Sequence, residues 1–249
     1  MLKEYQYKNF NIKYFAEIDS TNSYLLNQGR LNLAHEFEVA IADIQNQGRG
    51  RKNRKWQSYN ENLQFSLLLK PKVKIIEISQ LSILAVLALG EIIEELASSL
   101  NKEVEISYKW PNDLLLDSKK VAGILIENSI KNDQLHFVVI GMGVNLAKSP
   151  SSTIFPATNL KDLSLEINKI QFLERLLDKF KLFYNSWQDF GFANFRKLWL
   201  KKAYKVGQEI ELTIDDKKIV GIFSDIDDLG SMILQQQEKI RSISFAEVL

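Results

Sequence analysis

Three strand-like runs follow one another between residues 104 and 140, and no helical pattern separates them. They cover Val104 to Tyr108, Val121 to Glu127 and Leu135 to Ile140. Parallel neighbours need a long crossover, usually a helix, whereas antiparallel neighbours can be joined by a short turn. This part of the chain therefore predicts antiparallel pairing and argues against a doubly wound parallel sheet.

The remaining chain up to residue 203 mixes strand and helix patterns. Further strands are expected at Asn11 to Ile18, Phe37 to Ile44 and Leu63 to Leu69. An apolar stripe at helical spacing runs from Ile78 to Leu96, and two or three more helices are expected between Ile170 and Lys201. We predict an α+β domain over residues 1–203, with a mixed, largely antiparallel sheet.

From residue 204 the chain alternates short apolar runs with turn signals. Ile210, Leu212 and Ile214 alternate with polar residues, and turns are expected at Asp215-Asp216 and at Asp227 to Gly230. This pattern predicts a second domain over residues 204–249, folded as a small β-barrel.

The composition excludes several kinds of chemistry. The chain has no Cys, which rules out disulfides, thiolate nucleophiles and thiolate metal sites, and its two His residues are not at metal-ligand spacing. The net charge of +1 gives no overall attraction to nucleic acid or to an acidic membrane.

The N-terminus lacks the apolar region of a signal peptide. The apolar stretch Ile78 to Gly90 is too short to span a bilayer, so we expect a buried core helix and a soluble, cytoplasmic protein.

The segment from Gly48 to Trp56 is a glycine-containing basic loop. Five of the eight residues 48–55 are Arg or Lys, and the two glycines let the backbone approach a ligand closely. Such a loop can surround a polyanion with guanidinium and backbone N–H donors. A solvated surface or a nucleic-acid patch would explain the loop by itself. The confinement of the charge to one loop between two strands favours a ligand site.

Lys109-Trp110-Pro111-Asn112-Asp113 interrupts two strand-like runs. Pro111 favours an extended conformation before it, and Asn112-Asp113 suits a turn. Lys109 would then stand at a strand end, where its point charge can meet a carboxylate or a phosphate. Asp113 could balance that charge or help to hold Mg²⁺. An ordinary hairpin turn is the alternative.

The segment Gly141-Met142-Gly143-Val144-Asn145 ends a strand, but neither common nucleotide-binding fingerprint is present. Asn145 could pair with a base edge through its amide. No nucleophile motif occurs either. An enzyme with this sequence would therefore work by positioning and charge stabilisation, without a covalent intermediate on the protein.

Together these segments resemble the biotin–protein ligases. The resemblance covers nearly the whole chain. It rests on Ser20 to Asn22, Gln45 with the basic loop Gly48 to Trp56, Lys109 to Asp113, Lys120 to Glu127, and Gly141, Gly143 and Asn145. It implies a class II synthetase-like catalytic domain and an SH3-like C-terminal domain. It also implies that ATP activates biotin to biotinyl-5'-AMP, which then modifies a lysine of a biotin carboxyl carrier domain.

The same resemblance implies roles for individual residues. Lys109 and Arg51 would be catalytic. The biotin site would comprise Ser20, Thr21, Asn22, Gln45, Gly48, Arg49, Gly50, Arg51, Lys109 and Gly123. The nucleotide would contact Arg54, Trp56, Asn112 and Asn145. ATP would come with Mg²⁺, biotin would be a substrate, and no prosthetic group is expected. The family often has Gly where this chain has Asn53, a residue type that tolerates positive φ.

Some features point away from other members of the family and from other functions. Only residues 1–19 precede Ser20, too few for a helix-turn-helix module, so no DNA binding is expected. The Arg-Arg-x-Ser-Gly-Gly-Gly-type segment of lipoate or octanoate ligases is absent. A nucleic-acid-binding module would explain the basic loop but not Lys109 to Asp113. The acceptor protein and the choice between monomer and homodimer stay open.

Overall fold

A computed structural model of the protein describes residues 2–151, 153, 155–214, 217–237, 239–244 and 247–248. The expected turn at Asp215-Asp216 lies outside these residues. The turn at Asp227 to Gly230 is confirmed: the Gly230 amide donates to the Asp227 carbonyl oxygen over 2.9 Å. Gly230 has φ +80°, a conformation that costs a glycine little.

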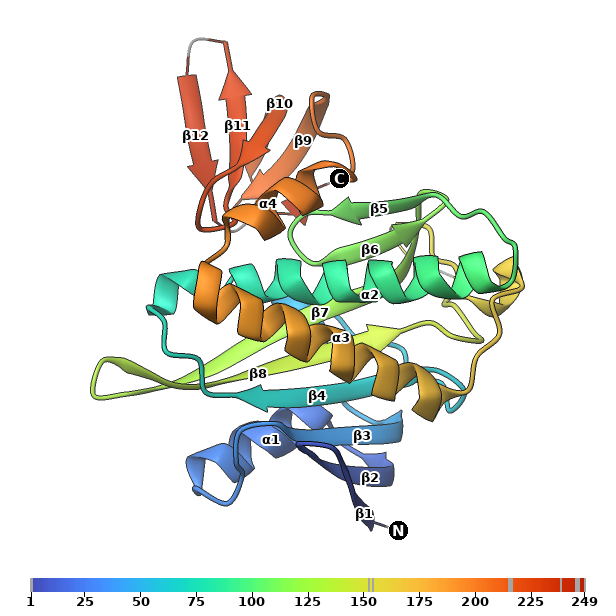
Figure 1. The fold of residues 1–249 in the computed structure, drawn as a ribbon. Helices are drawn as coiled ribbons and strands as arrows, with labels where there is room; N and C mark the ends of the chain where they lie inside the picture. The colour runs from blue at the N-terminus through green and yellow to red at the C-terminus, as the bar shows by residue number, and fades with distance from the viewer. Residues whose placement is uncertain are drawn as a thin grey trace.

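An eight-stranded sheet forms the body of the protein (Figure 1). Its order is β1 (Leu2–Tyr7), β2 (Phe10–Ile18), β3 (Glu38–Gln45), β4 (Leu63–Leu69), β8 (Gln134–Val144), β7 (Lys119–Lys131), β6 (Asp113–Leu116) and β5 (Ile106–Lys109). The β2–β3 pair is parallel and is joined through a helix, whereas the other neighbours are antiparallel. The predicted α+β class and the antiparallel pairing after residue 104 are therefore confirmed. Strands β1 and β6 were not predicted.

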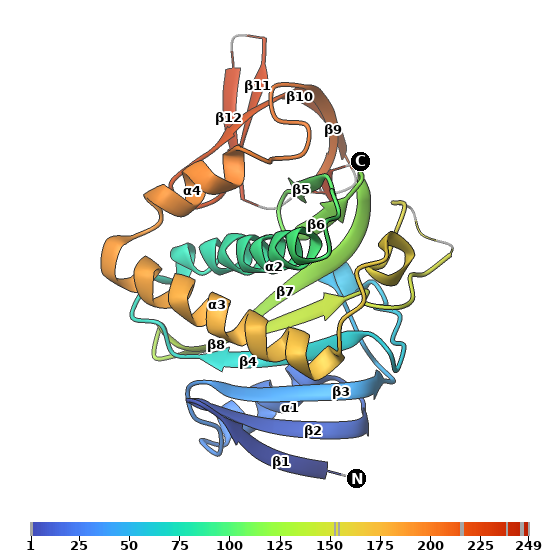
Figure 2. The ribbon, with the colours of Figure 1, turned by 45° about the vertical axis from the view of Figure 1, so that its right-hand side comes forward.

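Helices cover both faces of this sheet. Helix α1 (Thr21–Arg30) packs on one face, against β3, β4, β7 and β8. Gly29 allows this contact, since a Cβ atom there would lie 2.5 Å from the ring of Phe137. Helices α2 (Gln80–Ser99) and α3 (Lys169–Phe190) lie side by side on the other face (Figures 1 and 2). The sheet is therefore the middle layer of a three-layer domain.

The bounds of helix α2 lie close to those of the apolar stripe from Ile78 to Leu96 that the sequence marked as helical. With the 3₁₀ turn Ile75–Glu77, the helical segment runs from Ile75 to Ser99, long and apolar enough to cross a membrane. The uncharged stretch Ile78 to Gly90 lies within this segment, which continues past Glu91 to Ser99. The segment packs between the sheet and α3, however, and 67% of its most apolar window is buried. Its position is that of a core helix, as predicted.

The C-terminal part forms a second, smaller sheet. After α4 (Ala193–Leu200), the strands are β9 (Glu209–Ile214), β10 (Lys217–Ile226), β11 (Met232–Gln236), β12 (Lys239–Ile243) and β13 (Glu247–Val248). They pair in the order β12-β11-β10-β9-β13, and all pairs are antiparallel. Figure 1 shows these strands beyond β5, at the far end of the molecule from β1. The β-rich fold predicted for this part is confirmed.

The connection to the small sheet is made at strand β5. The Tyr108 amide donates to the Lys202 carbonyl oxygen over 2.8 Å, and the Tyr204 amide donates to the Tyr108 carbonyl oxygen over 2.9 Å. The buried Trp110 donates from its indole nitrogen to the Gly230 carbonyl oxygen over 3.0 Å. Residues on both sides of Lys109 are thus held by the C-terminal part.

Candidate active site

The sheet register aligns residues from separate sequence motifs in one row. Lys109 on β5 pairs with Asp113 on β6, Asp113 pairs with Gly123 on β7, and Gly123 pairs with Gly143 on β8. A cavity of about 600 Å³ lies over this row. The start of α1, the basic loop and the segment Lys109 to Asp113 all line it. Segments far apart in the sequence therefore meet at one site, and every site residue predicted above except Gly48 is among the lining residues.

Lys109 is a buried cation at the end of its strand. Its side chain is 8% exposed, and burial lowers its pKa to about 8, although Asp113 opposes this shift. Repulsion from Lys120, Lys205 and Arg54 lowers the pKa further. The ammonium lies 3.6 Å from the centroid of the Phe155 ring. A cation held in this way gains more from an anionic ligand than an exposed lysine would.

Asp113 is engaged by Lys120 across the floor of the cavity. Its Oδ1 lies 2.7 Å from Lys120 Nζ and forms an ion pair with it. The two groups are not aligned as a hydrogen bond requires, so this oxygen has no hydrogen-bond partner in the described part of the chain. A Cβ on Gly123 would lie 3.1 Å from Lys120 Nζ and 3.3 Å from Asp113 Oδ1, so Gly123 leaves room for this pair. Among the described residues, no group of three or more His, Cys, Asp or Glu could hold a metal ion. In this structure Asp113 balances the charge of Lys120.

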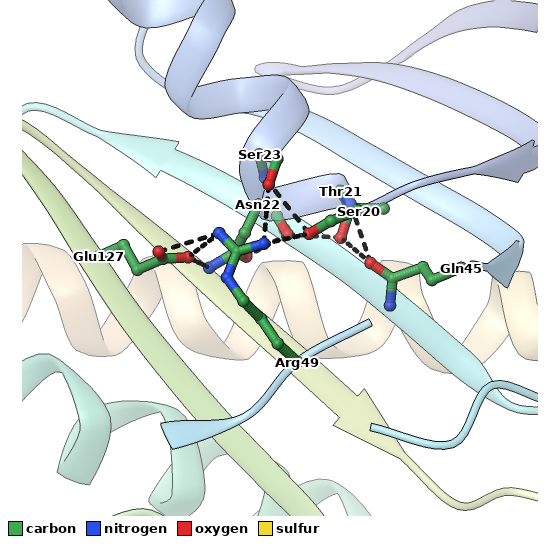
Figure 3. A network of polar contacts seen from close by, with 8 residues as sticks. Ser20, Thr21, Asn22, Ser23, Gln45, Arg49 and Glu127 are labelled. Carbon is green, nitrogen blue, oxygen red and sulfur yellow. Dashed lines mark hydrogen bonds and ion pairs between the residues drawn. The ribbon is translucent and has the colours of Figure 1, made fainter. Parts of the chain in front are cut away.

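The N-terminus of α1 lines the cavity on another side. Figure 3 shows its first residues with Gln45 and Arg49. Ser20 caps the helix and accepts a long hydrogen bond of 3.4 Å from the Ser23 amide. The Thr21 amide donates to Gln45 Oε1 over 2.8 Å, and the Thr21 hydroxyl lies 3.1 Å from the same oxygen. The structure thus brings Ser20, Thr21 and Gln45 together, as the sequence predicted.

The basic loop folds back on itself as a closed hairpin. The Trp56 amide donates to the Gly48 carbonyl oxygen over 2.9 Å, and the Gly50 amide donates to the Arg54 carbonyl oxygen over 2.7 Å. The 3₁₀ turn Arg51–Asn53 closes the hairpin, with Lys52 at φ 52°. The residue with positive φ in this loop is Lys52, next to the position where the family often has Gly and this chain has Asn53. Burial lowers the pKa of Arg51, and both Arg51 and Arg54 line the cavity.

Gly141 and Gly143 are required for space. A Cβ on Gly141 would lie 2.3 Å from Asn22 Oδ1, and a Cβ on Gly143 would lie 2.3 Å from Trp56 Cζ2. Both distances are far below van der Waals contact. Gly141 therefore leaves the space that Asn22 occupies, and Gly143 leaves the space that Trp56 occupies. The indole nitrogen of Trp56 is buried without a hydrogen-bond partner in the described part of the chain.

Asn112 and Asn145 lie at the cavity, but their amides are used by the protein. Asn112 Nδ2 donates to the Ile124 carbonyl oxygen over 2.5 Å. Asn145 Nδ2 donates to the Thr158 carbonyl oxygen over 3.1 Å, and its Oδ1 lies 3.4 Å from Asn62 Nδ2. Both side chains therefore hold loops around the cavity in this structure.

Sequence reasoning gave no role to Glu127, which contacts both the basic loop and α1. Arg49 donates to both carboxylate oxygens of Glu127, over 2.9 and 2.8 Å, and Asn22 Nδ2 donates to Oε2 over 2.7 Å (Figure 3). The sequence did contain a signal for this position. Residues i, i+2 and i+4 of a strand face the same side, so Glu127 lies on the same side of its strand as Gly123, which was predicted to be at the site. Lys120, Ser66 and Phe155 were also missed; Ser66 and Phe155 contact the site from distant segments, whereas Lys120 contacts Asp113 across the neighbouring strand.

Comparison with known proteins agrees with this arrangement. Residues 14–145 match the model of the biotin/lipoate A/B protein ligase family, and residues 205–249 match the biotin protein ligase C-terminal domain. A biotin–[acetyl-CoA-carboxylase] ligase of Paracoccus denitrificans is 33% identical, over 94% of this chain and 98% of the relative. The bifunctional ligase/repressor BirA of Bacillus subtilis is 32% identical, over 87% of this chain and 67% of the relative.

Solved structures agree with the sequence relatives. The Aquifex aeolicus biotin protein ligase, solved in complex with biotin and ATP, superimposes with a TM-score of 0.79 at 27% identity. The superposition covers 98% of both chains. With more than half of its residues matched by the family model, the chain belongs to the biotin/lipoate A/B protein ligase family.

Proposed function

We propose that this protein is an ATP-dependent biotin–protein ligase, which makes biotinyl-5'-AMP and transfers biotin to a lysine of a biotin carboxyl carrier domain. The observation that carries the proposal is the buried Lys109, which faces a cavity also lined by Arg51 and Arg54. Three cations around one cavity suit a reaction between a carboxylate and a triphosphate. Relatives matched over nearly their full length are biotin ligases, which supports biotin over lipoate.

In the first step, a carboxylate oxygen of biotin forms a bond to the α-phosphorus of ATP. The bond from that phosphorus to the bridging oxygen of pyrophosphate breaks, and pyrophosphate leaves. Two anions must approach each other, so the main barrier is electrostatic. Lys109 neutralises charge on the reacting oxygens, and Arg51 lies beside them. Mg²⁺ enters with ATP as part of that substrate.

In the second step, an uncharged lysine amine of the carrier domain attacks the acyl carbon. The bond between that carbon and the phosphate oxygen breaks, AMP leaves, and the amine releases one proton to solvent to give an amide. The phosphate of AMP is the leaving group, so the same cations stabilise it as it departs. No nucleophile of the enzyme is required in either step.

The proposal assigns biotin to the wall formed by the α1 N-terminus, where Thr21 and Gln45 present polar atoms to the cavity. It assigns the nucleotide to the side of Arg54 and Trp56. For Asn112 and Asn145 we propose that the contribution is indirect: each holds a loop that surrounds the ligand. Gly48, Gly50 and Arg49 shape the basic loop between the two ligands.

The wider setting belongs to the same proposal. We place the boundary between the catalytic domain and the small C-terminal domain at residues 203 and 204. We place the protein in the cytoplasm, where ATP and carrier domains are available together. No DNA target or membrane is part of the proposed function.

A transfer assay tests the proposal directly. The protein is incubated with MgATP, an apo carrier domain and either labelled biotin or labelled lipoate. We expect ATP-dependent label from biotin on one lysine of the carrier, and none when that lysine is replaced by Arg. Transfer of lipoate without transfer of biotin would overturn the proposal.

Arg51→Gly should loosen retention of the adenylate. The variant loses a buried guanidinium at the reacting carboxyl, so the intermediate should escape and react with unintended lysines. We expect label on a bystander protein to rise by about ten-fold or more relative to label on the carrier. Quantitative mass spectrometry of both proteins measures this ratio. A wild-type ratio at normal yield would remove Arg51 from this role.

A further inference from the structure

The Arg49 side chain closes the basic loop onto helix α1. Its Nη1 atom donates to Ser20 Oγ over 3.1 Å and to Ser23 Oγ over 2.7 Å. Its Nη2 atom donates to both oxygens of Glu127. The terminal nitrogens of this guanidinium group are therefore occupied by protein acceptors, unlike a residue poised to take a phosphate.

Glu127 also fixes the orientation of the polar side chains behind the α1 N-terminus. Asn22 gives its Nδ2 to Glu127, so its Oδ1 must accept, and the Ser66 hydroxyl donates to it over 2.5 Å. Ser66 has then used its only proton, so in the 2.6 Å contact between the two hydroxyls Thr21 is the donor. The Thr21 hydroxyl then has no proton left for Gln45 Oε1, 3.1 Å away, and that oxygen accepts from the Thr21 amide instead. A chain of oriented hydrogen bonds therefore joins Glu127 to Thr21, which lies beside Gln45 on the cavity wall.

We propose that Glu127 is a positioning residue that latches the basic loop shut through Arg49 and orients the cavity wall through Asn22. This inference rests on the proposed function, since the reaction intermediate is what the closed loop retains. Charge-assisted hydrogen bonds that join one guanidinium to both carboxylate oxygens are among the strongest polar contacts in proteins, and this one joins the basic loop to strand β7. Loss of the carboxylate charge weakens the latch without removing any atom that contacts the reacting groups.

The first experiment measures loop closure by limited trypsin digestion of the substrate-free protein. Cleavage after Lys52 and Arg54 reports the loop, and cleavage elsewhere reports the rest of the chain. We expect Glu127→Gln to speed loop cleavage by about ten-fold, the effect of losing one charge-assisted pair. Glu127→Asp, which keeps the charge on a shorter stem, should fall between this variant and the wild type. Arg49→Gln should match Glu127→Gln, and the double variant should be no faster, because the two residues act as one unit.

A matched control is available on the helices. Glu95 forms an ion pair with Arg175 between α2 and α3, outside the residues that line the cavity. Glu95→Gln should leave loop cleavage at the wild-type rate. If Glu127→Gln leaves loop cleavage unchanged, or speeds cleavage equally at sites outside the loop, the latch is overturned.

The second experiment measures what the latch does in the reaction. With MgATP, biotin, a carrier domain and a bystander protein, Glu127→Gln should raise the fraction of label on the bystander by about ten-fold. Biotin-dependent pyrophosphate exchange should change less than about three-fold, since the cations at the reacting atoms are intact. Faster loop cleavage with a wild-type label distribution would overturn the retention role. If the wild type forms no adenylate at all, the proposed function fails, while the digestion still decides the latch.

Discussion

Lys109→Ala should reduce formation of biotinyl-adenylate by about 100- to 1000-fold, which is the scale for losing one preorganised charge at a reacting centre. The side chain is 8% exposed and sits where the sheet row, the basic loop and the cavity meet. Biotin-dependent exchange of labelled pyrophosphate into ATP measures the first step alone. Transfer from separately prepared biotinyl-adenylate measures the second. Near-normal exchange in the variant would reject the role assigned to Lys109.

Lys109→Met separates the charge from the packing of the stem. Methionine keeps an unbranched side chain of similar reach, so it fills the space beside Phe155 without the ammonium. We expect the same loss of adenylate formation as in Lys109→Ala, because the charge is the cause. An active Lys109→Met variant would show that the packing of the stem, and not the cation, matters.

The lowered pKa of Lys109 also predicts opposite pH effects on activity and on stability. With a pKa of about 8, the free protein loses the Lys109 charge as the pH rises from 7 to 9, so kcat/KM for adenylate formation should fall. In the unfolded chain this lysine has a pKa of about 10.4. Between about pH 8 and about pH 10.4 the unfolded chain therefore binds more protons than the folded protein. The free energy of unfolding of the wild type should thus rise with pH relative to Lys109→Met over this interval. Parallel pH profiles of kcat/KM and of urea unfolding test both signs.

Gly143→Ala should lower kcat/KM for biotin by about 100-fold, the scale of a misplacement of about 1 Å at a reacting centre. The new Cβ would lie 2.3 Å from Trp56 Cζ2, so the indole must move, and the basic loop that ends at Trp56 must move with it. The strand itself should tolerate Ala, because Gly143 does not have a positive φ in this structure. The defect therefore comes from the clash alone.

A second variant isolates that clash. Once Trp56 is replaced by Ala, a methyl group at position 143 has no ring to meet, so Trp56→Ala and the double variant Gly143→Ala/Trp56→Ala should have the same kcat/KM. Strong non-additivity of this kind marks residues in contact. If the losses of the two single variants simply add, the contact between Trp56 and Gly143 is not the cause. Melting temperatures of all three variants check that the fold is kept.

Much of the main sheet could be predicted, because its strands carry local signals. The run Leu63 to Leu69 is a strand with the predicted bounds, and the runs Val121 to Glu127 and Leu135 to Ile140 pair antiparallel as their short connection required. The run Val104 to Tyr108 pairs instead with β6, which lies between it and β7. Strand β1 was missed because it lies at the sheet edge and is largely exposed, so the only alternation in it is the short pair Tyr5 and Tyr7 around Gln6. Strand β6 was missed because only four residues separate Asn112 from Asp117, and the segment reads as part of a turn.

The composition of the site was predictable, and its internal contacts were not. The residues that the sequence singled out share one cavity, since basic, glycine-rich and Pro-containing segments have recognisable compositions. The partners of Arg49 depend on the sheet register that brings Glu127 opposite the α1 N-terminus, and no local pattern encodes that register. The spatial need for Gly141 and Gly143 is likewise visible only once Asn22 and Trp56 are placed.

The pairing of residues 202–204 with Tyr108 has a consequence for how this enzyme can be shortened. A chain cut before residue 202 would leave the backbone groups of Tyr108 without partners and would uncover Trp110, which is buried against Gly230. Such an open, apolar strand edge invites pairing with other molecules. The small domain thus behaves as a protective cover for the strand that carries Lys109. Truncated versions should be sought among aggregates before they are judged inactive, whereas tags attached beyond the small sheet leave this cover in place.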